Sequence, residues 1–124
     1  MSVVKADLVG VWSLKSFRAG KTADLRPWGK AVSGLLIYTD TNYVSAALNR
    51  NLGLPGFKGA EDSLFYAGTY RVEGAQVIHQ VTLATSAQRI GASLVRDAVL
   101  QEGELTLSGL SETGTLFVLV WVRA

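Results

Sequence analysis

Hydrophobic and polar residues alternate along most of the 124-residue chain, in short segments rich in β-branched and aromatic residues. Turn-forming residues separate these segments, and a period of two is typical of strands with one buried face. Eight strands are predicted, over Leu8–Arg18, Gly34–Thr39, Tyr43–Leu48, Leu64–Val72, Gln76–Ala84, Ser93–Leu100, Glu104–Gly109 and Thr115–Arg123. The predicted fold class is therefore all-β, with helix limited to a turn or two within Asn49–Ser63.

The predicted connections alternate between short and long. Tight hairpins are expected across Asp40-Thr41, Glu73-Gly74 and Glu102-Gly103, and the remaining connections are longer. In an up-and-down meander successive turns fall at opposite ends, so all the short turns share one end. The sequence thus predicts a single domain over residues 1–124, an eight-stranded antiparallel up-and-down β-barrel. We expect it to be closed at one end and to hold an internal pocket.

The first strand carries Leu8-Val9-Gly10-Val11-Trp12-Ser13-Leu14, which resembles the Gly-x-Trp signature of lipocalin-like barrels. In that superfamily the tryptophan plugs the closed end, and an arginine near the end of the last strand packs across the indole. The resemblance implies structural roles for Gly10, Trp12 and Arg123. A guanidinium stacked on an indole also gains cation–π energy.

Three further segments resemble a bacterial lipocalin-like domain family. They are Gly34-Leu35-Leu36-Ile37-Tyr38-Thr39, then Tyr66-Ala67-Gly68-Thr69-Tyr70 followed by Val77-Ile78-His79, and the Pro27-Trp28-Gly29 loop. Members of this calycin-type family are largely of unknown function. The resemblance therefore implies a fold and a pocket rather than a reaction.

Alternation predicts which side chains face the barrel interior. Because Arg71 prefers water, the opposite face of its strand, with Tyr66, Gly68 and Tyr70, should point inward. On the next strand the more apolar set is Val77, His79, Val81 and Leu83. A two-residue turn at Glu73-Gly74 pairs Tyr70 with Val77, Gly68 with His79 and Tyr66 with Val81. This register predicts space beside the His79 ring.

The same reasoning applies to the last three strands. If Asp97 is outside, then Leu94, Arg96, Ala98 and Leu100 point inward, and the Glu102-Gly103 turn pairs Leu100 with Leu105 and Ala98 with Leu107. The run Leu116–Val122 is apolar on both faces, so Trp121 points inward or lies on an oligomer interface. A turn at Asp40-Thr41 pairs Tyr38 with Tyr43, on a face that the pattern leaves open.

Four inward-facing polar side chains are candidates for chemistry. His79 is either a general acid–base or a core histidine bonded to a tyrosine. Arg96 binds a ligand carboxylate or enolate oxygen, pairs with a buried carboxylate, or lies exposed at the mouth. Tyr66 and Tyr70 position a substrate oxygen, supply a phenolic proton, or simply pack.

A predominantly apolar wall should surround these groups. The predicted ligand-binding residues are Trp28, Leu36, Tyr38, Phe57, Leu64, Gly68, Val81, Leu94 and Trp121. Trp28 and Phe57 belong to long loops, where they form a hydrophobic lid over the pocket or serve as ordinary loop anchors.

Composition excludes several classes of function. With no cysteine and one histidine, we expect neither a disulfide nor a metal site, and no cofactor is predicted. The net charge is +2, but the basic residues are scattered, which argues against nucleic-acid binding. The sequence shows no signal peptide and no apolar stretch of membrane-spanning length, so a cytoplasmic location is expected. The doubly apolar last strand suggests a homodimer.

Two functions from different classes remain. Both place a small, largely apolar organic molecule inside the barrel. In one the protein is a cofactor-independent cyclase or isomerase of secondary metabolism, in which His79 and a tyrosine handle protons and Arg96 stabilises oxyanion charge. In the other it is a non-catalytic carrier. A purely structural or protein-interaction role is a third alternative.

Overall fold

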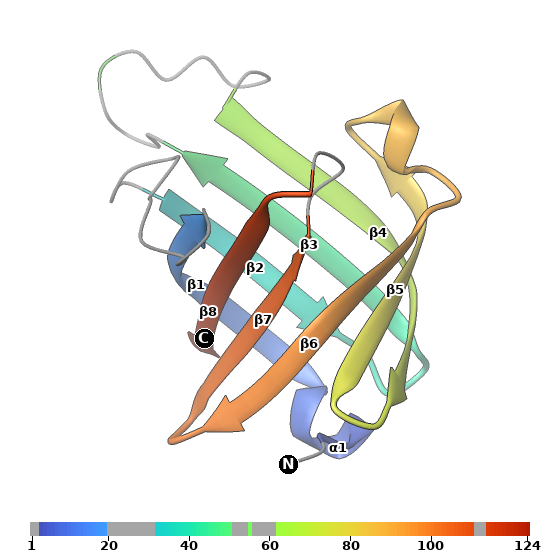
Figure 1. Ribbon diagram of the computed structural model, residues 1–124, viewed down its shortest axis with the longest axis vertical. Helices are drawn as coiled ribbons and strands as arrows, with labels where there is room; N and C mark the ends of the chain where they lie inside the picture. Colours follow the sequence, from blue (N-terminus) through green and yellow to red (C-terminus); the bar gives the residue numbers. More distant parts are fainter. Residues whose placement is uncertain (1–2, 20–31, 51–54, 56–61, 111–113) are drawn as a thin grey trace.

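The eight strands form a closed antiparallel barrel in which each strand pairs with its sequence neighbours and β1 pairs with β8 (Figure 1). The computed structural model describes residues 3–19, 32–50, 55, 62–110 and 114–124. The strands are β1 Gly10–Ala19, β2 Val32–Tyr38, β3 Tyr43–Arg50, β4 Ser63–Glu73, β5 Gln76–Ala84, β6 Ser93–Gln101, β7 Glu104–Leu110 and β8 Leu116–Arg123. The predicted up-and-down barrel is confirmed. Among the described residues, no helix is long and apolar enough to cross a membrane.

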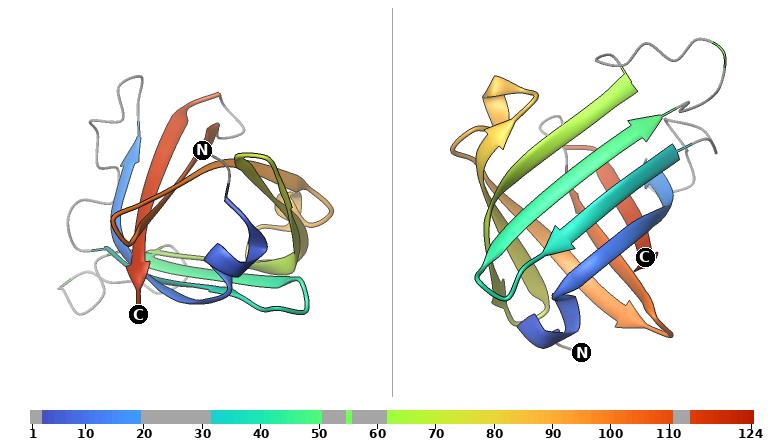
Figure 2. Two further views of the ribbon diagram at one scale, coloured as in Figure 1. Left: turned by 90° about the horizontal axis from the view of Figure 1, so that it is seen from below. Right: turned by 180° about the vertical axis from the view of Figure 1, so that it is seen from behind.

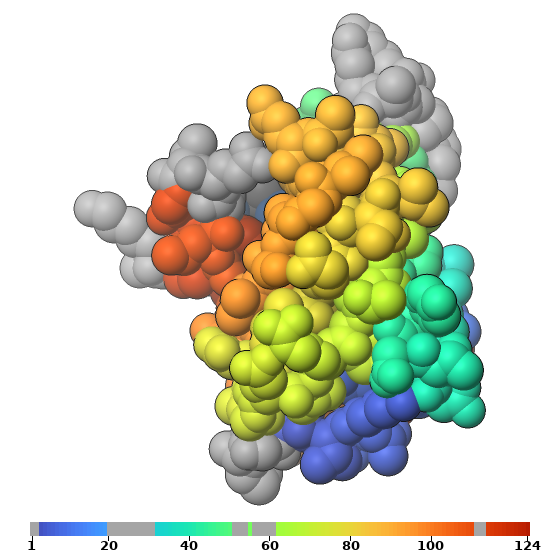
Figure 3. Space-filling model, turned by 90° about the vertical axis from the view of Figure 1, so that its right-hand side faces the viewer, coloured from blue at the N-terminus to red at the C-terminus, as the bar shows by residue number. Residues whose placement is uncertain are grey.

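One end of the barrel holds the three short connections, β2–β3, β4–β5 and β6–β7, together with the short helix α1 (Lys5–Leu8) (Figure 1). Figure 3 shows the blue N-terminal segment at this end, next to the yellow-green β4–β5 hairpin. Seen from below, α1 lies across part of the barrel opening (Figure 2, left). Leu8 is fully buried in the core that α1 covers. The expectation that Leu8 begins the first strand is wrong, because the backbone turns at Val9 and the strand starts at Gly10. This end of the barrel is the closed end.

Contacts of Trp12 and Arg123 stabilise this closed end. The Trp12 side chain is buried, and its Nε1 donates a hydrogen bond to the Leu8 carbonyl at 2.8 Å. The Arg123 guanidinium lies 3.9 Å from the indole centroid and donates to the carbonyls of Asp7 and Val9, each at 2.8 Å. At Gly10 an added Cβ would lie 2.5 Å from the Arg123 Nη1, so a larger residue would displace the guanidinium. One cation thus ties the indole, α1 and the last strand together.

The β6–β7 hairpin has the predicted register, whereas the β2–β3 hairpin does not. On β6 and β7, Leu100 pairs with Leu105 and Ala98 with Leu107, as predicted. The predicted pairing of Tyr38 with Tyr43 is wrong, since Tyr38 pairs with Val44. Asn42, at φ 74°, adds a third residue to that loop and shifts the register by one. Tyr38 consequently points inward, whereas Tyr43 is 59% exposed.

The β4–β5 register also differs from the predicted one. Glu73 pairs with Gln76, so the turn is Gly74-Ala75, and Tyr70 lies opposite His79 rather than opposite Val77. A shift of two residues leaves every side chain on its predicted face. Val77, His79 and Val81 are accordingly buried, as expected for an inward-facing set.

A β-bulge on β5 then reverses which side chains of that strand face the interior. The register shifts between Ala67 and Gly68, beyond which Ala67 pairs with Leu83 and Tyr66 with Ala84. The extra residue on β5 turns Leu83 outward, where it is 61% exposed, so its predicted inward position is wrong. Gly68 is required here, because an added Cβ would lie 1.8 Å from the Gln80 carbonyl oxygen.

The last strand turns its larger side chains inward. Phe117, Leu119 and Trp121 line the interior, which resolves the alternatives for Trp121. The outward-facing valines of the same strand are only half-buried. Their apolar character motivates the predicted homodimer, which stays a prediction.

Replacing Gly68 with alanine should destabilise the barrel by about 2–4 kcal/mol, because the methyl group must push apart two paired strands at the bulge. Gly74→Ala is the matched control. Gly74 has open space around it, and only its positive φ disfavours alanine, by about 1 kcal/mol. Urea unfolding measures both changes. Equal losses in the two variants would contradict the close approach at Gly68.

Candidate ligand-binding site

A cavity of about 380 Å³ lies inside the barrel. This volume is within the usual range for small-molecule pockets. Every strand contributes to its wall. The described residues that line it are Phe17, Leu36, Ala46, Leu48, Leu64, Tyr66, His79, Arg89, Leu94, Arg96, Leu107, Leu110, Phe117, Leu119 and Trp121. Apolar side chains dominate this wall, and none of the described residues that line it is acidic.

His79 lies in the wall between two tyrosines. It is buried on β5, and its Nε2 lies 2.6 Å from the Tyr38 hydroxyl of β2. Its Nδ1 lies 2.7 Å from the Tyr66 hydroxyl of β4. Both ring nitrogens are therefore hydrogen-bonded, in a chain that runs from the buried Tyr38 to Tyr66 at the cavity. The bond to a tyrosine expected of a core histidine is present, and the acid–base role of His79 stays a prediction.

Burial fixes the protonation states in this chain. Desolvation, reinforced by the nearby Arg96, lowers the pKa of His79 to about 3, so the ring is neutral at pH 7. Desolvation also raises the pKa of Tyr38 well above its usual value, and the neighbouring Tyr66 raises it further. Burial likewise raises the pKa of Tyr66, against the opposing effect of Arg96. All three groups are uncharged near neutral pH.

Arg96 brings a positive charge close to these groups. Its guanidinium carbon lies 4.7 Å from the Phe117 ring centroid, and its Nη1 donates to the Val95 carbonyl at 3.3 Å. Gly109 leaves room for it, since an added Cβ there would lie 3.0 Å from the Arg96 Nη1. Burial lowers the pKa of Arg96, whereas the tyrosines raise it. No carboxylate among the described residues forms an ion pair with this guanidinium.

Tyr70 is not part of this cluster. Its hydroxyl donates to the Thr39 carbonyl at 2.7 Å, and its ring contacts Tyr38 edge-on at 4.7 Å between centroids. Tyr70 therefore packs toward the closed end and does not border the cavity. The observed register places Tyr70 opposite His79, one residue farther from the hairpin turn than predicted, and its nomination as a catalytic residue stays a prediction.

Some of the predicted ligand-binding residues border the cavity and others do not. Leu36, Leu64, Leu94 and Trp121 border the cavity. Tyr38 does not line the cavity and instead contacts the lining residue His79 through its hydroxyl. Gly68 and Val81 pair with each other away from it, because the space expected at Gly68 is occupied by the β5 backbone. Trp28 and Phe57 lie outside the described residues.

Several wall residues were not predicted. They are Phe17, Ala46, Leu48, Arg89, Leu110, Phe117 and Leu119. Phe17 follows a register shift between Leu14 and Ser16 on β1, which simple alternation cannot locate. Arg89 lies in the 3-10 helix η2 (Ala87–Arg89) of a connecting loop, where no periodicity applies.

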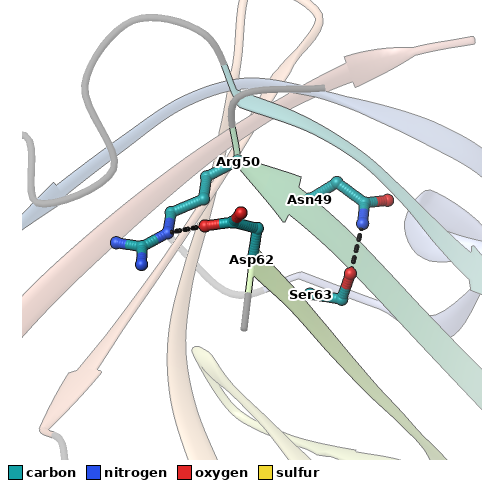
Figure 4. Close-up of polar contacts among 4 residues, drawn as sticks. All are labelled: Asn49, Arg50, Asp62 and Ser63. Atoms are coloured by element: carbon teal, nitrogen blue, oxygen red, sulfur yellow. Dashed lines mark hydrogen bonds and ion pairs between the residues drawn. The ribbon is translucent and has the colours of Figure 1, made fainter. Parts of the chain in front are cut away.

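Polar contacts join β3 and β4 at the ends farthest from their closed-end turns (Figure 4). The Nε of Arg50 lies 2.5 Å from the buried Asp62 carboxylate, and Asn49 donates to Ser63 at 2.6 Å. Because Asp62 is paired with Arg50, its carboxylate charge is compensated there. Within the described part of the chain, no group of three or more acidic or histidine side chains could hold a metal ion.

Acidification should weaken the fold through His79. The unfolded chain binds a proton at this residue near pH 6.5, but the folded chain only near pH 3. Between these values the unfolded state binds more protons, so the free energy of unfolding falls as pH falls, by up to about 1.4 kcal/mol per pH unit. Urea unfolding at pH 7, 6, 5 and 4 measures this slope. In His79→Gln, which cannot titrate, the slope should be smaller, and equal slopes would contradict a neutral buried His79.

Comparison with known proteins agrees with this architecture. Residues 9–57 match the model of a family described as a lipocalin-like domain. Comparison with curated protein sequences gave no match. A redesigned β-barrel aligns over 100% of this chain and 97% of its own, with a TM-score of 0.60 and 9% identity. Fatty-acid-binding protein 1 of Echinococcus granulosus aligns over 96% and 98%, with a TM-score of 0.52 and 15% identity. The chain thus has the closed antiparallel barrel fold of these structures, and it resembles the lipocalin-like domain family, as its Gly-x-Trp segment predicted.

Proposed function

We propose that the protein binds a small, largely apolar organic molecule inside the barrel and releases it unchanged. The observation that carries this proposal is the cavity of about 380 Å³ with its predominantly apolar wall. Protein interiors normally contain few voids larger than a water molecule. A space of this size in a 124-residue barrel is therefore a feature that the wall residues maintain.

Burial of an apolar ligand supplies the driving force. Each Å² of apolar surface removed from water stabilises the complex by about 25 cal/mol. The wall side chains also regain the dispersion contacts that an unfilled space denies them. Fatty-acid-binding protein 1 of Echinococcus granulosus, whose name states an apolar ligand, has the same type of fold, which supports a ligand inside the barrel.

Filling the cavity with a larger side chain should weaken ligand binding. Ala46 lines the cavity, whereas its neighbour Ala47 lies on the opposite, outer face of the same strand. We expect Nile red, a neutral apolar dye, to fluoresce with the wild type and with Ala47→Phe. Ala46→Phe should lose at least about tenfold in affinity, because the ring occupies the ligand's space. Circular dichroism checks folding, and Ala46→Leu is the milder variant if the ring is not tolerated.

Equal dye binding by the wild type and a folded Ala46→Phe variant would contradict binding inside the barrel. Absence of dye binding by the wild type would count against the proposal as a whole. Ala47→Phe adds the same ring to the outer surface, so it measures any dye that associates with exposed aromatic side chains.

A second candidate is a cofactor-independent cyclase or isomerase. The observation that favours it is the Tyr66 hydroxyl, bonded to His79 and close to Arg96 at the cavity. In such a reaction Tyr66 would exchange a proton with the bound molecule, and Arg96 would stabilise negative charge on an oxygen. A His79 with a pKa of about 3 is a weak base at neutral pH, so the geometry supports binding better than catalysis.

An aromatic β,γ-unsaturated ketone separates the two candidates. Isomerisation removes a proton from its α-carbon, shifts the double bond and returns a proton to the γ-carbon, giving a conjugated product that ultraviolet absorbance detects. The enzyme hypothesis predicts turnover that falls at least about tenfold in Arg96→Met and His79→Ala but not in Tyr43→Phe, which alters an exposed tyrosine. Binding of the ketone without turnover supports the carrier.

A further inference from the structure

The hydrogen-bonded side chains of Tyr38, His79 and Tyr66 have more donor protons than there are hydrogen bonds between them. A neutral imidazole carries one N–H and one bare nitrogen, and each tyrosine carries one O–H. These three donors form only the two hydrogen bonds that join the groups, at 2.6 Å and 2.7 Å. One tyrosine hydroxyl proton must therefore point away from the other two side chains.

Burial decides which tyrosine keeps the spare proton. Tyr38 is 1% exposed, and among the described residues its hydroxyl has no hydrogen-bond partner besides His79. A buried O–H without an acceptor is strongly disfavoured. Tyr66 instead borders the cavity, where water or a ligand can accept its proton. Tyr38 thus donates to Nε2, the Nδ1–H of His79 donates to Tyr66, and the Tyr66 proton is left for the cavity.

The other polar groups of the wall are donors too. Arg96 has five N–H groups and no acceptor, and it lies close enough to the Tyr66 hydroxyl to interact with it electrostatically. Arg89 adds a second guanidinium to the wall, and neither aspartate nor glutamate is among the residues that the structure describes there. The buried Nε1 of Trp121, another wall residue, has no partner among the described residues. This excess of donors and positive charge complements an anionic acceptor.

We propose that the ligand carries an oxyanion, such as a carboxylate or an enolate, held jointly by the Tyr66 hydroxyl and the Arg96 guanidinium. The Nδ1–H tautomer of His79 makes Tyr66 a donor, so His79 acts as a positioning residue and Tyr66 and Arg96 determine head-group specificity. This inference rests on the proposed binding function. It adds the polar end of the ligand, which the apolar wall alone does not specify.

Two ligands that differ only in their head group test the proposal. Decanoate and 1-decanol have the same apolar chain, and each can be titrated against bound Nile red. Decanoate should displace the dye at a concentration at least about tenfold lower, because hydrogen bonds to a charged acceptor are the stronger kind. Equal displacement, with dye binding intact, would overturn the oxyanion and leave the binding function standing. Failure of the dye and both ligands to bind would overturn the binding function itself.

Substitutions locate the head group. Tyr66→Phe and Arg96→Met should each weaken decanoate about tenfold and change 1-decanol little, because each removes a donor that the alcohol needs less. Tyr43→Phe removes an exposed hydroxyl and is the matched control. An unchanged preference for decanoate in both folded cavity variants would place the head group elsewhere and overturn the proposal.

The histidine tautomer is measured without any substitution. His79 is the only histidine of the chain, so the ring signals of ¹⁵N-histidine-labelled protein belong to it alone. We expect a protonated Nδ1 and a bare Nε2 at pH 7, both before and after addition of decanoate. A protonated Nε2 would overturn the positioning role, because Tyr66 would then donate to His79 instead of to the ligand.

Discussion

Pairing of β1 with β8 is the interaction on which the rest of the structure depends. Without it, both strands would be open sheet edges and the interior would be continuous with solvent. The ladder runs from Trp12 opposite Arg123 to Ala19 opposite Phe117. At one end it brings the guanidinium onto the indole, and nearer the other it brings Phe17 beside the inward side chains of β8. Closure thus creates the plug and the cavity wall together, which is why a short chain can keep an internal space.

Local signals were sufficient to predict the barrel. Every predicted strand boundary lies within two residues of the observed one, because alternation and turn residues are both properties of neighbouring positions. Errors arose wherever one extra residue entered a strand or loop. Asn42 lengthens the β2–β3 loop, and the bulge at Gly68 turns Leu83 outward. A single added residue inverts the faces of everything beyond it, and the sequence pattern does not mark where the insertion lies.

Some residues of the candidate site could be predicted from the sequence, and others could not. Tyr66, His79 and Arg96 lie on uninterrupted stretches of β4, β5 and β6, so alternation alone placed them on one interior surface. The contact between Tyr38 and His79 could not be predicted, because β2 and β5 are not paired and meet only across the closed barrel. Tyr38 nevertheless determines how His79 shares its protons. The most informative residue for the chemistry of the site was thus among the hardest to assign.

The polar residues of the cavity wall, Tyr66, His79 and Arg96, also carry an energetic argument. A core built for stability alone would fill this region with apolar side chains, since desolvated charges and unpartnered donors oppose folding. Here burial disfavours the charged form of Arg96, and Trp121 leaves an indole N–H without a described partner beside the same cavity. Gly109 leaves the space that the guanidinium occupies, at the expense of packing. These costs are concentrated in one wall of one cavity, where a bound anion would offset them. Their location, more than any single contact, distinguishes a binding site from an imperfectly packed core.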